Sequence, residues 1–279
     1  MKTQSYILHA LSPLHAGTGQ AAELIDLPIA RLKGTGIPYV PGSSIKGVLR
    51  DARNGSAEVE AVFGPDTGHA GDHAGALVCT DARLMALPVR SFHGTFGFVT
   101  SPLLLTLAAR DLEEPPPVPK PPPNHCMAGP QLAEGDTVYL EDLDLTAVPA
   151  EPAWAAWQKR LAPIFGQSAD EQQVFSSRFA VVDDETMTFL WETATQLDQR
   201  VRISPDTRTV AKGALWLEES LPPETLLIGL LLAEQSRKQD YRRLSPEEVL
   251  QVALPQGEQV LQFGGKSTVG RGRCRMVPL

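Results

Sequence analysis

The stretch Gly264-Gly265-Lys266-Ser267-Thr268-Val269-Gly270-Arg271-Gly272-Arg273 combines closely spaced glycines with basic side chains. A phosphate-binding P-loop, G-x-x-x-x-G-K-[ST], requires a glycine at position 260, which is occupied by Val260. What remains is G-x-x-x-x-G-x-G between two short apolar segments. Such glycines let backbone amides approach a polyphosphate chain closely, while Lys266 and Arg271 neutralise its charge. The stretch therefore predicts a strand, a phosphate-binding loop and a further strand.

The composition is that of a globular protein. The 279 residues are 42% hydrophobic and 21% charged, and no apolar run is long enough to span a bilayer. We expect a cytoplasmic protein with no membrane partner, because the first residues are too interrupted for a secretion signal. The three cysteines, Cys79, Cys126 and Cys274, are widely spaced and predict free thiols.

Basic residues are concentrated in two segments, although the net charge of the chain is -8. No Asp or Glu occurs between residues 27 and 50, or from residue 259 onward. The basic residues of these segments are Arg31, Lys33, Lys46 and Arg50 in the first, and Lys266, Arg271, Arg273 and Arg275 in the second. An acidic protein repels phosphate at long range, so local basic clusters favour a narrow track for one polyanion. Two solvated charged surfaces are the alternative that charge alone leaves open.

Hydrophobic periodicity and turn residues predict a mixture of helices and strands. A strand over residues 5–11 precedes a long loop to residue 41, which we expect to be functional. Ser43 and Ser44 then predict a serine-capped helix whose start offers an anion site, with Lys46 and Arg50 on another face. Further helices are expected over residues 57–63, 103–112, 152–164 and 246–254, and strands over residues 76–89, 94–100, 137–145, 226–232, 260–263 and 274–277.

Two segments interrupt this alternation. Residues 113–130 begin with EEPPPVPKPPP, which predicts an extended, polyproline-like insertion that is free to move. Residues 179–216 are rich in β-forming and charged residues around Ser204-Pro205-Asp206, so they predict a long hairpin. The whole order indicates an α+β protein in one domain over residues 1–279. Its expected core is a ferredoxin-like (RNA-recognition-motif-like) βαββαβ palm with long insertions.

Six short motifs occur in order along the chain. They are Pro13-Leu14-His15-Ala16-Gly17, Ile25-Asp26-Leu27-Pro28, Ile37-Pro38 with Pro41-Gly42-Ser43-Ser44-Ile45-Lys46-Gly47, Gly94-Thr95-Phe96 with Val99-Thr100-Ser101-Pro102-Leu103, Lys212-Gly213-Ala214-Leu215-Trp216, and the stretch from Gly264 to Arg273. Together they resemble the RAMP superfamily, and most closely the repeated backbone subunit of type III-B (Cmr) CRISPR effector complexes. The resemblance runs from the first expected strand to the last.

The resemblance implies that several copies of the chain stack along a guide CRISPR RNA, together with other subunits of a type III complex. Each palm would hold the guide backbone, and each thumb hairpin, placed at residues 194–216, would kink the guide and its paired target RNA. The resemblance further implies that each copy cuts the target RNA once, using a divalent metal (Mg²⁺ or Mn²⁺) and an aspartate in the first long loop. That aspartate is Asp26. The expected guide-binding residues are His15, Ser43, Ser44, Lys46, Arg50, Gly264, Gly265, Lys266, Ser267 and Arg271.

Asp26 has chemistry that suits this role. In-line RNA cleavage needs a deprotonated 2′-hydroxyl and compensation of phosphate charge, and a loop carboxylate can take the proton or hold a hydrated metal ion. One carboxylate suffices if the kinked target already places the 2′-oxygen in line. The residues alone also allow Asp26 to cap its own loop, and only the resemblance favours catalysis.

Other candidates have structural alternatives. His15 can be a general acid, a guide contact or a satisfied structural group, and we favour the guide contact. His69 and His73 have metal-ligand spacing only on a helix, which their glycine-rich surroundings disfavour. Trp154, Trp157 and Trp191 are expected in the core, whereas Trp216 can be a core or a base-stacking residue.

We therefore predict an RNA-guided, metal-dependent endoribonuclease subunit that is inactive alone, because its target must first pair with a guide. One alternative is a scaffold that binds guide RNA without cutting. Another is a RAMP endonuclease that processes precursor CRISPR RNA, in which a histidine would matter more than a metal.

Overall fold

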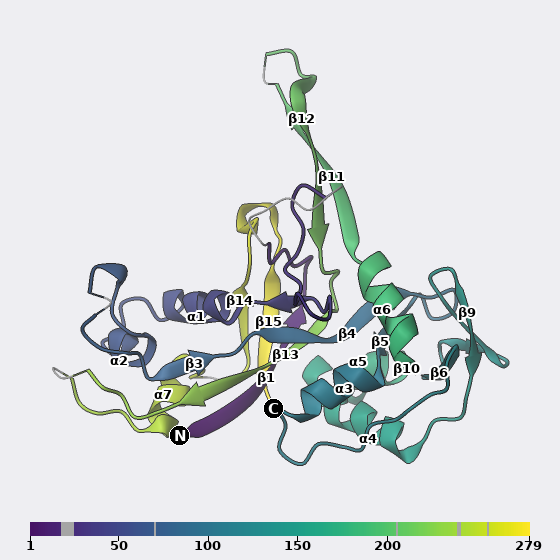
Figure 1. Cartoon of the computed structure of the whole chain (residues 1–279), viewed down its shortest axis with the longest axis horizontal. Helices are drawn as coiled ribbons and strands as arrows, with labels where there is room; N and C mark the ends of the chain where they lie inside the picture. Colours follow the sequence, from purple (N-terminus) through teal and green to yellow (C-terminus); the bar gives the residue numbers. More distant parts are fainter. Residues whose placement is uncertain (18–24, 70, 205, 239–240, 256) are drawn as a thin grey trace.

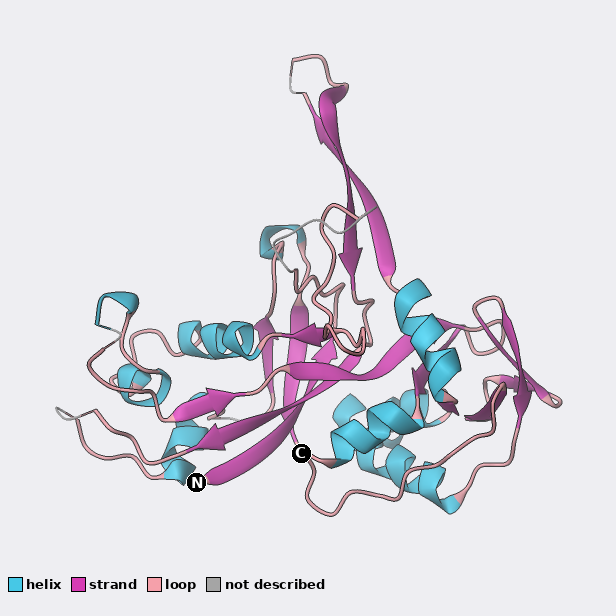
Figure 2. Ribbon diagram, viewed as in Figure 1, coloured by secondary structure: helices cyan, strands magenta, loops and turns pink. Residues whose placement is uncertain are grey.

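The structure, a computed structural model, describes residues 1–17, 25–69, 71–204, 206–238, 241–255 and 257–279. These residues form a large mixed sheet, helices packed against it, and a separate two-stranded hairpin that projects from the body (Figure 1, Figure 2). No helix in these ranges is long and apolar enough to cross a membrane.

The centre of the sheet is the predicted βαββαβ palm. Its elements in chain order are β1 (Lys2–Ala10), α1 (Gly42–Asp51), β4 (Ala82–Arg90), β13 (Leu226–Ala233), α7 (Pro246–Ala253) and β15 (Arg273–Pro278). The strands lie in the order β15-β1-β13-β4, and every neighbouring pair is antiparallel. This is the ferredoxin-like arrangement, so the α+β prediction is confirmed.

Alternating side chains of these strands build two hydrophobic cores. Tyr6 and Leu8 of β1 belong to one core, together with Leu49 of α1 and Val249 of α7. Ile7, between them, belongs to the other core. This core contains the aromatic side chains of residues 152–176, which we call the helical insertion. Since successive side chains of a strand point to opposite faces, the palm sheet is covered on both faces.

Short strands extend the palm at its edges. They are β2 (Tyr39–Val40), β3 (Leu77–Cys79) and β14 (Gln259–Gln262). Beyond β4 the sheet continues through β5 (Phe96–Thr100), β10 (Phe179–Val182), β6 (His125–Ala128), β9 (Leu143–Ala147), β8 (Thr137–Leu140) and β7 (Ala133–Glu134). The remaining helices are α2 (Val59–Phe63), η1 (Thr67–His69), α3 (Pro102–Ala109), α4 (Pro152–Leu161), η2 (Ala162–Phe165), α5 (Ala169–Ser176), α6 (Asp184–Thr193) and η3 (Ser267–Val269).

Two of the expected helix starts are confirmed by their capping residues. The Ser101 side chain caps α3, and Ser245 with Glu248 forms the capping box of α7. Both helices have proline in the first turn, as expected. The predicted tryptophan core is also confirmed, because Trp154, Trp157 and Trp191 are all buried.

Two expectations for the middle of the chain were wrong, and one helix signal was missed. Residues 179–216 are not one hairpin, because α6 interrupts them; the Asp183 carboxylate accepts hydrogen bonds from the amides of Glu185 and Thr186 and starts this helix. The capping box of Ser168 and Glu171, which starts α5, was overlooked. The strand expected over residues 137–145 is the antiparallel pair β8 and β9.

The proline-rich insertion is attached to the body. The indole Nε1–H of Trp157 donates a hydrogen bond to the carbonyl oxygen of Pro117 (3.0 Å), and Val118 packs against the second core. Residues 113–123 contain no helix or strand, as predicted, but β6 falls within the remainder of the predicted loop. The segment is therefore extended and lies against α4, and its expected mobility stays a prediction.

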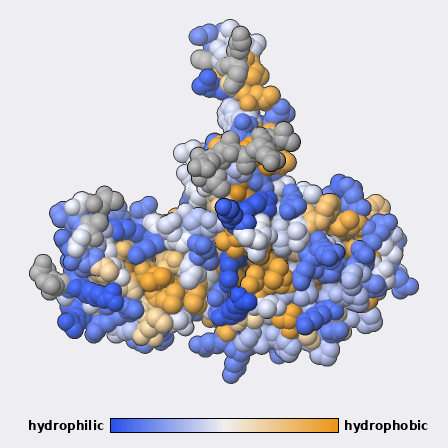
Figure 3. Space-filling view, in the orientation of Figure 1, coloured by the Kyte–Doolittle hydropathy of each residue, from blue (hydrophilic) through white to orange (hydrophobic). Residues whose placement is uncertain are grey.

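The hairpin consists of β11 (Gln196–Ile203) and β12 (Val210–Ser220) and matches the predicted thumb position; Pro205 of its expected turn lies outside the described residues. Val201 lies opposite Leu215, and Arg200 lies opposite Trp216. Because neighbouring residues alternate between faces, one face is apolar and the other charged. The exposed apolar side chains of the hairpin are Leu197, Val201, Ile203, Val210 and Leu215, and apolar colour is visible along it (Figure 3).

The loop between β14 and β15 allows a matched test of glycine packing. Gly270 and Gly272 have positive φ angles of 81° and 77°, but only a Cβ on Gly272 would meet backbone, 1.8 Å from the carbonyl oxygen of Phe263. We expect Gly270→Ala to lower the free energy of unfolding by about 1–2 kcal/mol, the cost of the left-handed conformation. Gly272→Ala should lower it by at least a further ~2 kcal/mol. Urea denaturation of both variants measures the difference, and equal values would contradict the observed close packing.

Candidate functional site

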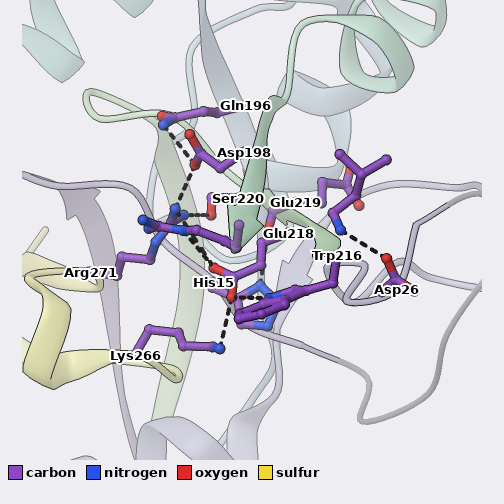
Figure 4. Close-up of polar contacts among 12 residues, drawn as sticks. His15, Asp26, Gln196, Asp198, Trp216, Glu218, Glu219, Ser220, Lys266 and Arg271 are labelled. Carbon is purple, nitrogen blue, oxygen red and sulfur yellow. Dashed lines mark hydrogen bonds and ion pairs between the residues drawn. The ribbon is translucent and has the colours of Figure 1, made fainter. Parts of the chain in front are cut away.

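Three segments that are distant in sequence meet at the base of the hairpin: the first long loop, the β12 end of the hairpin and the glycine-rich loop (Figure 4). Leu14 forms a β-bridge with Leu221 at the end of β12. The amide of Gly265 donates to the carbonyl oxygen of His15 (3.0 Å), and that of Gly272 donates to Pro13 (2.8 Å). The motifs at residues 13–17 and 264–273 are therefore a single structural unit.

The glycines of the loop allow the chain to pack against itself. Gly264 has a φ of 72°, and a Cβ there would lie 2.3 Å from the carbonyl oxygen of His15. Lys266 also adopts the left-handed conformation, with a φ of 68°. Sequence reasoning assigned these glycines to phosphate contact, but their close approach to the first loop and to Phe263 is a sufficient structural reason for them.

His15 is a buried structural group. Its imidazole Nδ1 lies 2.7 Å from the carbonyl oxygen of Glu219, which can only accept, so Nδ1 carries the hydrogen. The Nε2 side faces Gly17, where a Cβ would lie 2.7 Å away. The His15 side chain thus joins the first loop to β12, and the expected guide contact stays a prediction.

The start of α1 differs from the predicted serine cap. The N-cap is Pro41, and no side chain caps the helix. The amide of Gly42 donates to the Asp81 carboxylate (2.8 Å), so part of the expected anion site is already occupied by an acidic side chain. Ser43 is exposed and Ser44 is half-buried inside the first turn.

A groove of about 350 Å³ runs between the first loop, α1 and the glycine-rich loop. It is lined by Ala16, Gly17, Pro41, Ser44, Gly47, Val48, Asp51, Gly264 and Gly265. The small residues leave room for an extended ligand beside two of the predicted contact segments. The half-buried Lys46 belongs to the same helix.

Arginines of the two basic clusters are bound inside the protein. Arg31 pairs with Glu219 (2.6 Å), and Arg50 donates to the carbonyl oxygens of Gly64 and Pro65. Arg271 is buried and pairs with Asp198 (2.5 Å), and Arg275 pairs with Glu258 (3.1 Å). The other members, Lys33, Lys46, Lys266 and Arg273, are exposed or half-buried. Arg50 and Arg271 therefore have structural roles that charge patterning did not reveal.

Glu218 lies at the centre of this site and was missed by sequence reasoning. Its side chain is 3% exposed and accepts hydrogen bonds from Lys266 Nζ (2.8 Å), Trp216 Nε1 (2.7 Å) and Arg200 Nε (3.3 Å). Burial alone would raise the pKa of this carboxyl, but the bonds from Lys266 and Trp216 and the nearby cations outweigh it and lower the pKa to about 2. Glu218 is therefore an ionised, buried hub (Figure 4).

Trp216, for which a core role and a base-stacking role were both considered, lies in neither hydrophobic core. The residue is half-buried, its indole N–H is bound to Glu218, and Lys266 Nζ lies 5.9 Å from the ring centroid. Such a contact is a cation–π interaction. The ring thus belongs to the charged network at the base of the hairpin and not to either hydrophobic core.

Asp26 is exposed and lies beside β12. Its Oδ2 accepts a hydrogen bond from the amide of Leu217 (2.8 Å). The next residue, Leu27, pairs with the same strand, donating to Leu217 (3.1 Å) and accepting from the amide of Glu219 (3.0 Å). The carboxylate thus has a defined orientation beside the hairpin, on the predicted loop.

The protein supplies few metal ligands. Within the described ranges, no group of three or more His, Cys, Asp and Glu side chains could hold a metal ion. His69 pairs with Asp66 and His73 with the carbonyl oxygen of Glu60, so these histidines do not converge. Asp26 alone fits only a largely hydrated ion of the Mg²⁺ type, which is commonly held by one or two carboxylates plus substrate phosphates.

Comparison with known proteins defines the class. A RAMP superfamily model matches residues 7–275, and the chain belongs to this superfamily. The CRISPR system Cmr endoribonuclease Cmr4 of Pyrococcus furiosus is 31% identical, over 98% of this chain and 94% of that protein.

Solved structures agree with this assignment. The crystal structure of oligomeric Cmr4 from Pyrococcus furiosus is similar with a TM-score of 0.76 at 25% identity, covering 100% of this chain and 98% of that one. A chain in a type III-B Cmr-beta complex bound to cognate target RNA has the same fold, with a TM-score of 0.76 at 18% identity over 100% and 97% of the two chains.

The ionisation of Glu218 predicts a pH dependence of stability. Its pKa in the folded protein, about 2, lies below the ordinary value of 4.5, so its contribution is present above about pH 4.5 and is lost as the pH falls towards 2. Between pH 4.5 and pH 2 the free energy of unfolding should fall for both proteins. The fall should be larger for the wild type than for Glu218→Gln, and the difference should reach about 3 kcal/mol. Urea denaturation across the pH range measures this. The variant Glu192→Gln, at an exposed position of α6, is the control, and parallel wild-type and Glu218→Gln curves would refute the expectation.

Proposed function

We propose that this chain is a backbone subunit of a type III RNA-guided CRISPR ribonucleoprotein, which binds guide RNA along a stack of copies and cleaves the paired target RNA at regular intervals. The observation that carries the proposal is the exposed Asp26 carboxylate, oriented by Leu217 at the base of the projecting hairpin. Membership of the RAMP superfamily and 31% identity to a Cmr endoribonuclease support it.

The proposed partners are guide CRISPR RNA, target RNA, further copies of this chain and other subunits of the complex. An oligomeric relative and a related complex bound to target RNA support this set. The groove beside α1 and the glycine-rich loop is the proposed path of the guide backbone. Lys46 and Lys266 would face its phosphates, and the hydroxyls of Ser43 and Ser44 would donate hydrogen bonds to them.

Cleavage by such a site is a transesterification at phosphorus. The 2′-oxygen of the target forms a bond to phosphorus as the bond to the leaving 5′-oxygen breaks. The Asp26 carboxylate takes the proton of the 2′-hydroxyl, and water supplies a proton to the leaving oxygen. A divalent ion held by Asp26, water and RNA oxygens would add charge compensation at the phosphate. A single protein carboxylate makes the geometry of the bound RNA decisive, so the lone subunit should be inactive.

The first test is cleavage of guide-complementary RNA by the reconstituted complex with Asp26→Ala in every copy. We expect the cleavage rate to fall at least about a hundredfold, because the proposed proton acceptor is lost, while target binding persists. The matched control is Asp136→Ala, an exposed loop aspartate far from Asp26 in the sequence. Unchanged cutting in an intact complex would reclassify the chain as an RNA-binding scaffold.

Metal dependence needs its own measurement. We expect EDTA to abolish cutting by the wild-type complex, and excess Mg²⁺ or Mn²⁺ to restore it, because phosphate charge must be compensated. A processing enzyme that uses a histidine would continue to cut precursor RNA in EDTA. Full activity of the target-cutting complex in chelator would remove the metal from the proposal and leave Asp26 as proton acceptor.

A further inference from the structure

The strand segment that orients Asp26 is anchored on both of its faces. Residues 216–219 of β12 alternate between the two sides of the hairpin, so Trp216 and Glu218 point one way and Leu217 and Glu219 the other. Glu219 is buried and connects to the first loop, accepting from Arg31 (2.6 Å) and from the amide of Ile29 (3.0 Å). Thr195, next to β11, donates to the same carboxylate (2.9 Å).

On the other face, Glu218 connects the segment to the glycine-rich loop. Glu218 Oε1 forms an ion pair with the Nζ of Lys266 in this loop (2.8 Å). Oε2 faces Arg200 of β11 (3.3 Å) and, further away, Arg271 (3.8 Å). One buried carboxylate thus joins both strands of the hairpin to the loop that is proposed to meet guide phosphates.

Between these anchors lies the Leu217 amide, which is bound to Asp26. This amide belongs to the peptide bond between Trp216 and Leu217. The neighbours of Leu217 in sequence are Trp216 and Glu218, and the Trp216 indole donates a hydrogen bond to Glu218 (2.7 Å). The two residues that flank Leu217 are therefore joined by a hydrogen bond between their side chains. Lys266 is connected to Asp26 through hydrogen bonds from Lys266 to Glu218, from Trp216 to Glu218 and from Leu217 to Asp26, together with the peptide bond between Trp216 and Leu217 (Figure 4).

The charges of the network leave it able to receive an anion. It combines Arg200, Lys266 and Arg271 with Asp198 and Glu218, which is one positive charge in excess. Arg200 and Lys266 are 39% and 36% exposed, whereas Arg271 is 4% exposed, so a phosphate can reach the first two. Of these two, Lys266 is the one that lies on the glycine-rich loop beside the groove. A phosphate there would compete with Glu218 for the same ammonium group.

We propose that Glu218 is a positioning residue for Asp26, which transmits phosphate binding at Lys266 to the Leu217 amide that orients the catalytic carboxylate. The inference rests on the proposed function for its catalytic consequence. Its structural consequence, that Glu218 holds the Leu217 and Leu27 backbone in place, is independent of that function. The two can therefore fail separately.

The catalytic consequence is measured in the reconstituted complex with Glu218→Gln in every copy. This variant retains the size of the side chain and an acceptor for Trp216, but loses the charge that holds Lys266 and Arg200. We expect the single-turnover cleavage rate at saturating target to fall about tenfold or more, since small misplacements of reacting groups are costly. Target affinity should stay within about twofold of the wild-type value. Loss of fold or of assembly would instead lower both the cleavage rate and the target affinity. Glu247→Gln is the control and should cut like the wild type.

The structural consequence is measured by amide hydrogen exchange of the isolated full chain. Glu218→Gln should raise deuterium uptake in residues 25–29 and 215–219, and leave residues 2–10 and 226–233 of the palm at wild-type values. Asp26→Ala should raise uptake at residues 215–219 in the same experiment. If Glu218→Gln does not fold, Trp216→Phe removes one donor to Glu218 and should show the same uptake pattern, with a rate lowered about threefold.

Two results would overturn the inference: unchanged uptake at residues 215–219, or a Glu218→Gln complex that cuts at the wild-type rate. If Glu218→Gln raises deuterium uptake at residues 215–219 but the wild-type complex cuts no target, the positioning contact is supported and the proposed function is refuted.

Discussion

The buried carboxylate of Glu218 is the interaction on which the base of the hairpin depends. A two-stranded hairpin has little stability of its own, and this one has an exposed apolar face. Its attachment comes from ion pairs between β12, β11 and the glycine-rich loop. A buried charge is costly unless it is paired, so loss of one partner destabilises the rest. The same pairing keeps the functional loops in register with the hairpin.

The palm supplies the rigid support for this arrangement. β1 pairs with both β13 and β15, which brings the beginning and the end of the chain together, and each face of the sheet is covered by its own core. The first loop and the glycine-rich loop leave this sheet at neighbouring positions, where Gly265 binds His15. A site composed of loops is thus held by adjacent strands, which is how flexible segments obtain a defined geometry.

Several elements were readable from sequence because their signals are local. The capping box at Ser245, the proline after Ser101 and the apolar run of β13 each depend on residues within one turn or strand. α6 was missed because its β-branched and aromatic residues favour a strand, whereas tertiary packing of Met187, Leu190 and Trp191 supports a helix. The serine cap of α1 was wrong because Asp81, distant in sequence, binds the first helical amide.

By itself, the sequence determined the order of the palm elements, the place of the hairpin, the family, and Asp26 as the candidate for catalysis. The palm order and the hairpin follow from periodicity and turn chemistry, the family follows from short motifs, and the choice of Asp26 follows from the resemblance to that family. Only the tertiary structure showed which charged residues are buried and bound within the protein. Arg271 carries the same charge as Lys46, but it is buried and bound to Asp198, while Arg50 is bound to the backbone carbonyls of Gly64 and Pro65. Pairing of this kind is a property of three-dimensional distance, which charge patterning in one dimension does not contain.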